Sequence, residues 1–144
     1  MEPNREIDHQ MPSVKCVGRD GVTRELEFQW QFDELDRVWR FFVYKVPRPP
    51  SGEIFDMTFT PISDTTVRQT SIAHHSEPAY VGMGIPDAML PLVKTIIGKE
   101  IESSPPDGVV AGMFRSPDAE KMWRRLRENG IAEYIEERRV YRVL

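Results

Sequence analysis

The clearest alternation of apolar and polar residues runs from residue 22 to residue 32. Its apolar positions are Val22, Leu26, Phe28, Trp30 and Phe32. Side chains two residues apart lie on the same face of a strand, so this spacing predicts a half-buried β-strand. The preceding segment, residues 18–21, has the glycines and aspartate of a turn and predicts a hairpin from a short strand at residues 14–17.

Residues 38–46 are apolar on both faces and predict a central strand. A helix through Phe32, Leu35, Trp39 and Phe42 is the alternative, because these positions also fit a 3.6-residue period. The prolines and glycine of residues 47–52 interrupt the pattern, and further strands are predicted at residues 54–60 and 66–72. The first half of the chain therefore predicts an antiparallel meander of four or five strands.

The second half changes to a helical period. Its first apolar stripe is Ile85, Ala88, Met89, Leu92, Val93 and Ile96, which predicts a helix that ends at Gly98. Pro86 suits the first turn of this helix, whereas Pro91 is expected to kink it. Residues 99–104 predict a short strand, and the prolines that follow predict a loop.

A second helix is predicted from Ser116-Pro117-Asp118, which combines a capping hydroxyl, a proline for the first turn and an acid near the positive end of the helix dipole. Asn129-Gly130 ends it. Residues 131–134 and 139–143 then predict a terminal hairpin. Together these elements predict an α+β fold with an antiparallel or mixed central sheet of about six to seven strands and two main helices in the C-terminal half.

Length and composition favour one soluble domain. The chain has 144 residues, of which 40 % are hydrophobic, enough for one core spanning residues 13–144, with residues 1–12 as a flexible N-terminus. A formal net charge of −4 argues against a nucleic-acid partner, and no apolar run reaches the roughly 20 residues that cross a bilayer. A single cysteine, Cys16, excludes an intrachain disulfide and favours a reducing, cytoplasmic location.

Two glycines stand close together in Tyr80-Val81-Gly82-Met83-Gly84-Ile85, where a loop leads into the first helix. Glycines let the backbone approach a ligand closely, and free amides at the start of a helix attract phosphate. Val81, Gly82, Met83, Gly84 and Ile85 are therefore candidate cofactor-binding residues. An ordinary loop leading into a helix is the alternative interpretation.

The order of elements after these glycines is an amphipathic helix, a short strand, the helix beginning Ser116-Pro117-Asp118-Ala119, and a closing pair of strands. This order, over roughly residues 76–144, resembles the C-terminal half of the GCN5-related N-acetyltransferase (GNAT) superfamily. The resemblance implies an acyl-CoA N-acyltransferase-like fold, with acetyl-CoA or another acyl-CoA as cofactor. It also implies that Gly82, Gly84 and neighbouring amides cradle the CoA pyrophosphate.

The resemblance further implies transfer of an acyl group from a small-molecule donor to an amine acceptor. The attacking amine must lose its proton, and Glu77 is the nearest carboxylate candidate for the base. Tyr80 and Tyr134 are candidate acids, although both also fit as core-edge aromatics. Two positions depart from the pattern of the family: Ala79 replaces its usual Gln or Arg, and Trp123 replaces its frequent tyrosine.

These departures favour a second hypothesis, a non-catalytic GNAT-like scaffold or interaction protein. The aromatic sheet of the first half offers a surface for a homodimer. A small-ligand pocket lined by Trp30, Trp39 and Phe42 is a third hypothesis, ranked below a filled core. The adjacent His74 and His75 would point to opposite faces of a strand, so no metal site is expected.

Overall fold

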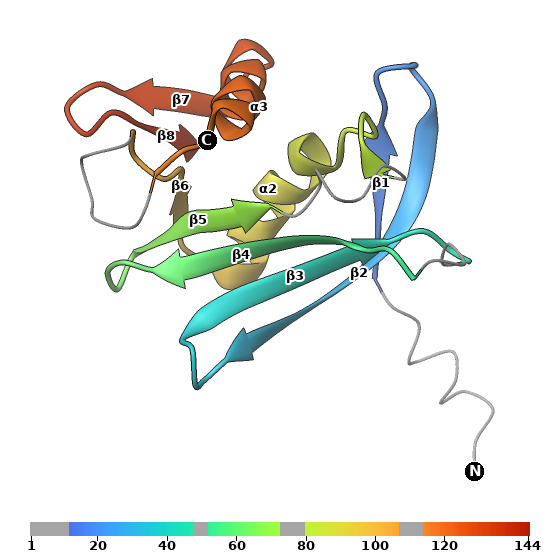
Figure 1. Cartoon of the computed structure of the whole chain (residues 1–144), viewed down its shortest axis with the longest axis horizontal. Helices are drawn as coiled ribbons and strands as arrows, with labels where there is room; N and C mark the ends of the chain where they lie inside the picture. The colour runs from blue at the N-terminus through green and yellow to red at the C-terminus, as the bar shows by residue number, and fades with distance from the viewer. Residues whose placement is uncertain (1–11, 48–51, 73–79, 107–113) are drawn as a thin grey trace.

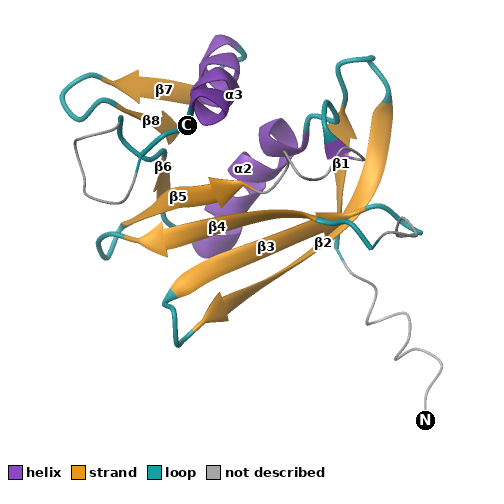
Figure 2. Cartoon of the chain, viewed as in Figure 1, coloured by secondary structure: helices purple, strands orange, loops and turns teal. Residues whose placement is uncertain are grey.

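The computed structural model describes residues 12–47, 52–72, 80–106 and 114–144. In these residues one mixed sheet packs against two helices (Figures 1 and 2). The elements are β1 Ser13–Val17, β2 Thr23–Asp33, β3 Val38–Tyr44, β4 Phe55–Pro61, β5 Thr66–Ile72, α2 Ile85–Ile97, β6 Glu100–Glu102, α3 Pro117–Glu128, β7 Ala132–Ile135 and β8 Val140–Val143.

The sheet has eight described strands in the order β1-β2-β3-β4-β5-β6-β8-β7. Only β5 and β6 pair in parallel, across the connection that contains α2, and the other neighbours are antiparallel. The predicted α+β class is therefore confirmed, while the predicted count of six to seven strands is slightly low. Each of the eight described strands, β6 included, falls in a segment for which the sequence predicts a strand.

The segment after β2 forms a strand, so the alternative helix through residues 32–42 is wrong. Asp33 turns the chain locally: its Oδ1 accepts hydrogen bonds from the amides of Leu35 and Asp36, both at 3.0 Å. This local side-chain bonding competes with helical hydrogen bonds and closes the β2–β3 hairpin instead.

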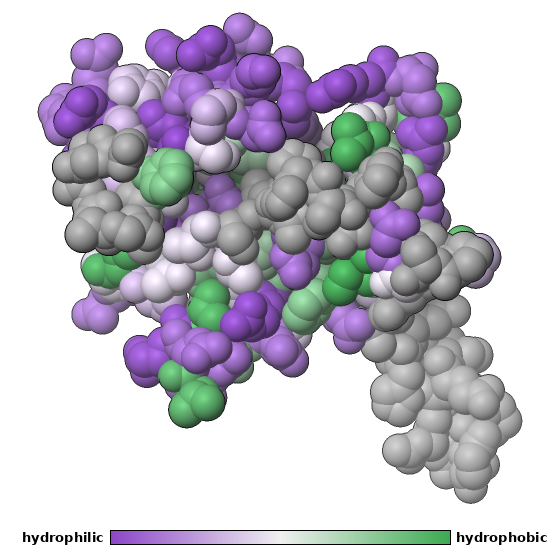
Figure 3. Space-filling view, in the orientation of Figure 1, coloured by the Kyte–Doolittle hydropathy of each residue, from purple (hydrophilic) through white to green (hydrophobic). Residues whose placement is uncertain are grey.

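The two faces of the sheet differ in polarity. On the helix face, which α2 and α3 cover, the strands contribute buried apolar residues: Leu26, Phe28, Phe41, Val43, Phe55, Met57, Phe59, Val67, Ile101, Ala132, Tyr141 and Val143. On the open face, which neither described helix covers, they contribute Arg40, Phe42, Asp56, Thr58, Thr60, Arg68 and Glu102. Figures 1 and 2 show α2 behind the central strands, and in the same view the surface is mostly polar with separate apolar patches (Figure 3).

This division also tests the predicted aromatic pocket. Trp30 and Trp39 lie on the helix face, where Trp30 is directly opposite Phe41. Phe42 alternates to the open face, where it lies opposite Asp56. The three side chains therefore do not line one pocket.

Both helices begin as predicted. In α3, Ser116 is the N-cap and its Oγ accepts a hydrogen bond from the Ala119 amide at 3.1 Å, with Pro117 in the first turn. In α2, Gly84 and Gly98 are the two caps, and the helix continues through Pro91. The lost donor at Pro91 is tolerated on the exposed side of the helix.

Cys16 lies on β1, and its side chain is fully buried in the core. Burial raises the pKa of its thiol to about 11, and the negative charge of Asp87 adds to the shift. The side chain therefore packs as a small apolar residue and has little thiolate character at neutral pH.

Candidate functional site

The glycine loop, defined as residues 80–84, leads directly into α2. Gly82 and Gly84 have φ angles of 76° and 77°, in the left-handed region that glycine adopts without strain. The Gly84 carbonyl accepts a hydrogen bond from the Ala88 amide at 3.3 Å and so begins the helix. Pro86 follows in the first turn, where its missing amide costs nothing.

The loop packs tightly against the end of β1. A Cβ atom built at Gly84 would overlap the carbonyl oxygen of Val17. The Arg19 amide donates to the Gly82 carbonyl at 2.9 Å, and a Cβ at Gly18 would lie only 2.9 Å from that same carbonyl oxygen. Gly84 is therefore required by packing, whether or not a ligand approaches.

The amides of Gly84 and Ile85 lie where the glycine loop meets α2, and neither donates a hydrogen bond to a described residue outside the helix. Val81 and Gly82, in contrast, lie in a hydrogen-bonded turn. The carbonyls of Gly82 and Gly84 are occupied, whereas the donors at the positive end of α2 are not. Such donors can accept an anion.

A groove of about 490 Å³ opens beside the loop. Val17, Gly18 and Arg19 line one side of it, and side chains of α3 line another. The charged side chains that line it are Arg19, Asp87, Asp118, Lys121 and Arg125. Basic residues thus exceed acidic ones in the groove, in contrast to the net negative charge of the whole chain.

One ion pair in the groove joins the two helices. Arg125 of α3 contacts Asp87 of α2 at 2.7 Å, and Asn129 Nδ2 donates to the same carboxylate at 3.3 Å. Arg125 is thus largely neutralised, which leaves the exposed side chains of Arg19 and Lys121 as the cations available to a ligand.

Two of the three predicted catalytic residues, Tyr80 and Tyr134, lie in the described part of the chain, and they do not line the same groove. Tyr80 is 2 % exposed, and its hydroxyl donates to the Glu53 carbonyl at 2.9 Å and accepts from the Lys45 amide at 3.1 Å. Tyr134 lies on β7, packed edge-on against Tyr141 at 4.9 Å, and does not line the groove. Glu77, like His74 and His75, lies outside the described residues.

Trp123, at the position where the family resemblance implies a tyrosine, is fully buried. Its indole stacks on Tyr141 at 6.0 Å, and its Nε1 donates to the side chain of Gln69 at 3.4 Å. Gln69 lies on β5 just beyond the last residue that pairs with β6, Arg68. At Gln69 the β5 backbone is bonded by a side chain and not by a backbone amide: Ser104 Oγ donates to the Gln69 carbonyl at 3.0 Å.

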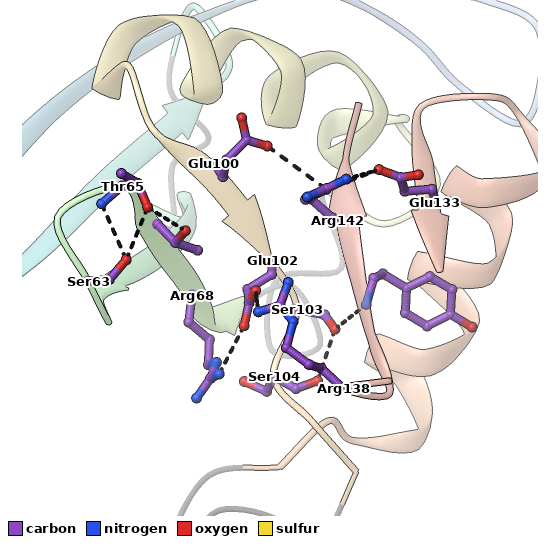
Figure 4. A network of polar contacts seen from close by, with 12 residues as sticks. Ser63, Thr65, Arg68, Glu100, Glu102, Ser103, Ser104, Glu133, Arg138 and Arg142 are labelled. Atoms are coloured by element: carbon purple, nitrogen blue, oxygen red, sulfur yellow. Dashed lines mark hydrogen bonds and ion pairs between the residues drawn. The ribbon is translucent and has the colours of Figure 1, made fainter. Parts of the chain in front are cut away.

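Sequence reasoning missed a buried carboxylate on the open face. Glu102 is fully buried and contacts Arg68 at 2.9 Å and Arg138 at 2.6 Å (Figure 4). The three residues connect β5, β6 and the turn between β7 and β8. No sequence signal identifies them, because their partners stand 34 and 36 positions apart.

A second polar network surrounds Arg115. Its guanidinium donates to Ser103 Oγ, to the Ser104 carbonyl and to Glu120, at 3.1, 2.7 and 2.7 Å. Tyr141 donates to the other oxygen of Glu120 at 2.6 Å. Burial acts to raise the pKa of Glu120, but the hydrogen bonds from Tyr141 and Arg115 outweigh it and lower that pKa. Donors and acceptors are matched in this network, which fits a structural role.

Among the described residues no group of histidine, cysteine and carboxylate side chains could hold a metal ion. Neither described helix is long and apolar enough to cross a membrane. A scan of protein-family models, a search of curated proteins and a search of solved structures each find no match to this chain.

Proposed function

We propose that this chain binds acyl-CoA in the glycine-loop groove and transfers the acyl group to an amine. The order of elements supports this proposal. A parallel strand pair, β5 and β6, is joined through a glycine loop and a helix, and α3 and a closing hairpin follow. The pairing of β5 and β6 stops after Arg68, so the two strands are not held together by a ladder beyond it.

The observation that carries the proposal is the N-terminus of α2, where the amides of Gly84 and Ile85 donate no hydrogen bond to a described residue outside the helix, beside a groove with available cations. A diphosphate needs backbone donors, a helix N-terminus and positive side chains, and the groove offers all three. Its volume of about 490 Å³ lies in the range that small-molecule sites occupy.

Acyl transfer also requires proton transfer from the attacking amine. Within the described residues, Tyr80 has both hydroxyl roles occupied by main-chain groups, so it is a poor candidate acid. Glu77, which precedes the glycine loop in the sequence, remains the candidate base of this proposal.

A second candidate function is acyl-CoA binding without turnover, as a scaffold or interaction protein. The buried indole of Trp123 favours it, because an indole N–H is not a usual proton donor. The hydroxyl of Tyr80 favours it too, because that hydroxyl already donates its proton to a main-chain carbonyl.

Calorimetric titration tests the binding step. We expect heat with acetyl-CoA, with CoA and with 3′,5′-ADP, and much less with pantetheine, because the groove recognises phosphate. Lys121→Glu should weaken CoA binding by about tenfold or more, because it places a like charge beside the phosphates. Lys15→Glu, an equal charge change outside the lining of the groove, is the matched control. No heat and no thermal shift at millimolar acetyl-CoA would refute the proposal.

Release of free CoA from acetyl-CoA, followed with a panel of primary amines, separates the two candidates. Amine-dependent release supports acyl transfer, and its loss in Glu77→Gln would support that residue as the base. Binding without release in any amine supports the scaffold instead.

A further inference from the structure

Within the described residues the outer edge of β2 is only partly covered. β2 runs from Thr23 to Asp33, but β1 pairs with it only as far as Glu27. Among the described residues, the last contact on this side is the hydrogen bond from the Phe28 amide to the Pro12 carbonyl at 3.0 Å. Pro12 has no amide to return a second hydrogen bond.

The backbone groups beyond this point are directed outward. Amide and carbonyl groups alternate between the two sides of a strand, and the β2–β3 register is regular throughout. Since the Phe28 amide points toward β1, the groups of Trp30 and Phe32 point to the same outer side. Within the described residues no hydrogen bond reaches these outward groups, and Figure 1 shows no labelled strand beside this end of β2.

The side chains of this edge do not oppose pairing. Residues 28–32 carry no charge and no proline, although exposed edges usually carry lysine or proline to prevent association. Trp30 is 40 % exposed and stacks on Phe41 at 6.0 Å, so it presents a fixed aromatic surface. Gln31 is exposed on the open face.

We propose that this edge pairs with the same edge of a second copy, antiparallel, with the two-fold axis through Gln31. In this register Trp30 lies opposite the partner's Phe32. The outward backbone N–H and C=O groups of these two residues then bond to each other across the interface. Gln31 meets the partner's Gln31, whose side-chain amides can bond to each other. Gln29 lies opposite the partner's Asp33. The sheet then continues through both copies.

Self-complementarity favours a second copy over another partner. A two-fold axis brings each residue near itself or a near neighbour, so a charged edge would repel its copy. This edge is neutral at its centre, and an aromatic pair on each side of the axis buries apolar surface on the helix face. Placing the axis at Gln31 also leaves the hydrogen bond between Phe28 and Pro12 intact. The proposal does not depend on the proposed acyl-CoA site.

Sedimentation velocity over a concentration series tests it. We expect the full chain to form dimers, and Gln31→Lys to raise the dimer dissociation constant at least about tenfold, because two lysines then face each other at the axis. Gln29→Lys, the same change on the same strand face, should leave the dimer intact because it meets the partner's Asp33. An equimolar mixture of Gln31→Lys and Gln31→Glu should restore dimers.

Three outcomes would overturn the proposal: a wild-type chain that stays monomeric at all concentrations, Gln31→Lys that dimerises as wild type does, or Gln29→Lys that disrupts the dimer as strongly as Gln31→Lys. Circular dichroism of each variant confirms that it is folded, since both glutamines point away from the helix-covered core.

Discussion

Gly84 is the residue at which backbone conformation and packing coincide. Its positive φ of 77° already disfavours a side chain, and the Val17 carbonyl occupies the place of a Cβ. Gly21 has the same φ of 77° but nothing within 4 Å of an added Cβ. The pair therefore separates the cost of strain from the cost of overlap.

We expect Gly21→Ala to lower the free energy of unfolding by about 1–2 kcal/mol, the cost of a left-handed alanine. Gly84→Ala should cost at least about 2 kcal/mol more, because β1 and the glycine loop must move apart. Urea denaturation of both variants measures the difference. Equal losses would show that the loop is not held against Val17.

Asp56 lies half-buried on the open face, and burial raises its pKa above the usual 3.8, although the charge of Arg40 acts in the opposite direction. A carboxyl whose pKa is raised on folding stabilises the folded protein fully only below its unfolded pKa, and that stabilisation is lost as pH rises through the folded pKa. At neutral pH the ionised Asp56 therefore lowers the stability of the folded protein.

Asp56→Asn should consequently raise the melting temperature at pH 7, and the gain should shrink as the pH falls through the raised folded pKa of Asp56 and be lost below its unfolded pKa of about 4. Melting curves at several pH values measure this. A gain that is equal at pH 3 and pH 7 would assign the effect to something other than ionisation.

At the scale of elements, Glu102 links the two parts of the sheet. It joins β6 to Arg68 of β5 and to Arg138 of the terminal hairpin, beside a parallel pairing of only three residues. We expect Glu102→Gln to cost about 3 kcal/mol, because Glu102 is fully buried and the change breaks its ion pairs with both Arg68 and Arg138. Glu133→Gln removes an ion pair that is about 40 % exposed and should cost less than about 1 kcal/mol. Similar losses in the two variants would contradict this assignment.

The elements themselves follow from local patterns. Alternation in β2 and the cap and proline at the start of α3 reflect forces between near neighbours, so the sequence predicts them well. Contacts between distant segments leave no such trace. The sequence could not show that Val17 packs on Gly84, that Tyr80 bonds to Glu53, or that Arg68 meets a buried Glu102. Because the contact between Gly84 and Val17 joins distant segments, the sequence predicted only a ligand-binding role for the two glycines. The structure shows that Gly84 is also required for packing.

At the scale of the whole molecule, one core connects both halves of the chain. The buried cluster includes Cys16 and Leu26 from the first strands, Val93 of α2, Trp123 of α3 and Val143 of the last strand. We therefore expect a single cooperative unfolding transition. Tryptophan fluorescence and far-ultraviolet circular dichroism should give the same urea midpoint. Separate midpoints would mean that the terminal hairpin and α3 unfold independently.

The burial of Cys16 makes the native chain well suited to site-directed labelling. Because its thiol is shielded from solvent and hardly ionised, maleimide dyes should pass it by while the protein stays folded. A cysteine placed at Lys121 would then carry the dye alone. Its fluorescence would report directly on what enters the groove, with the natural thiol left unmodified.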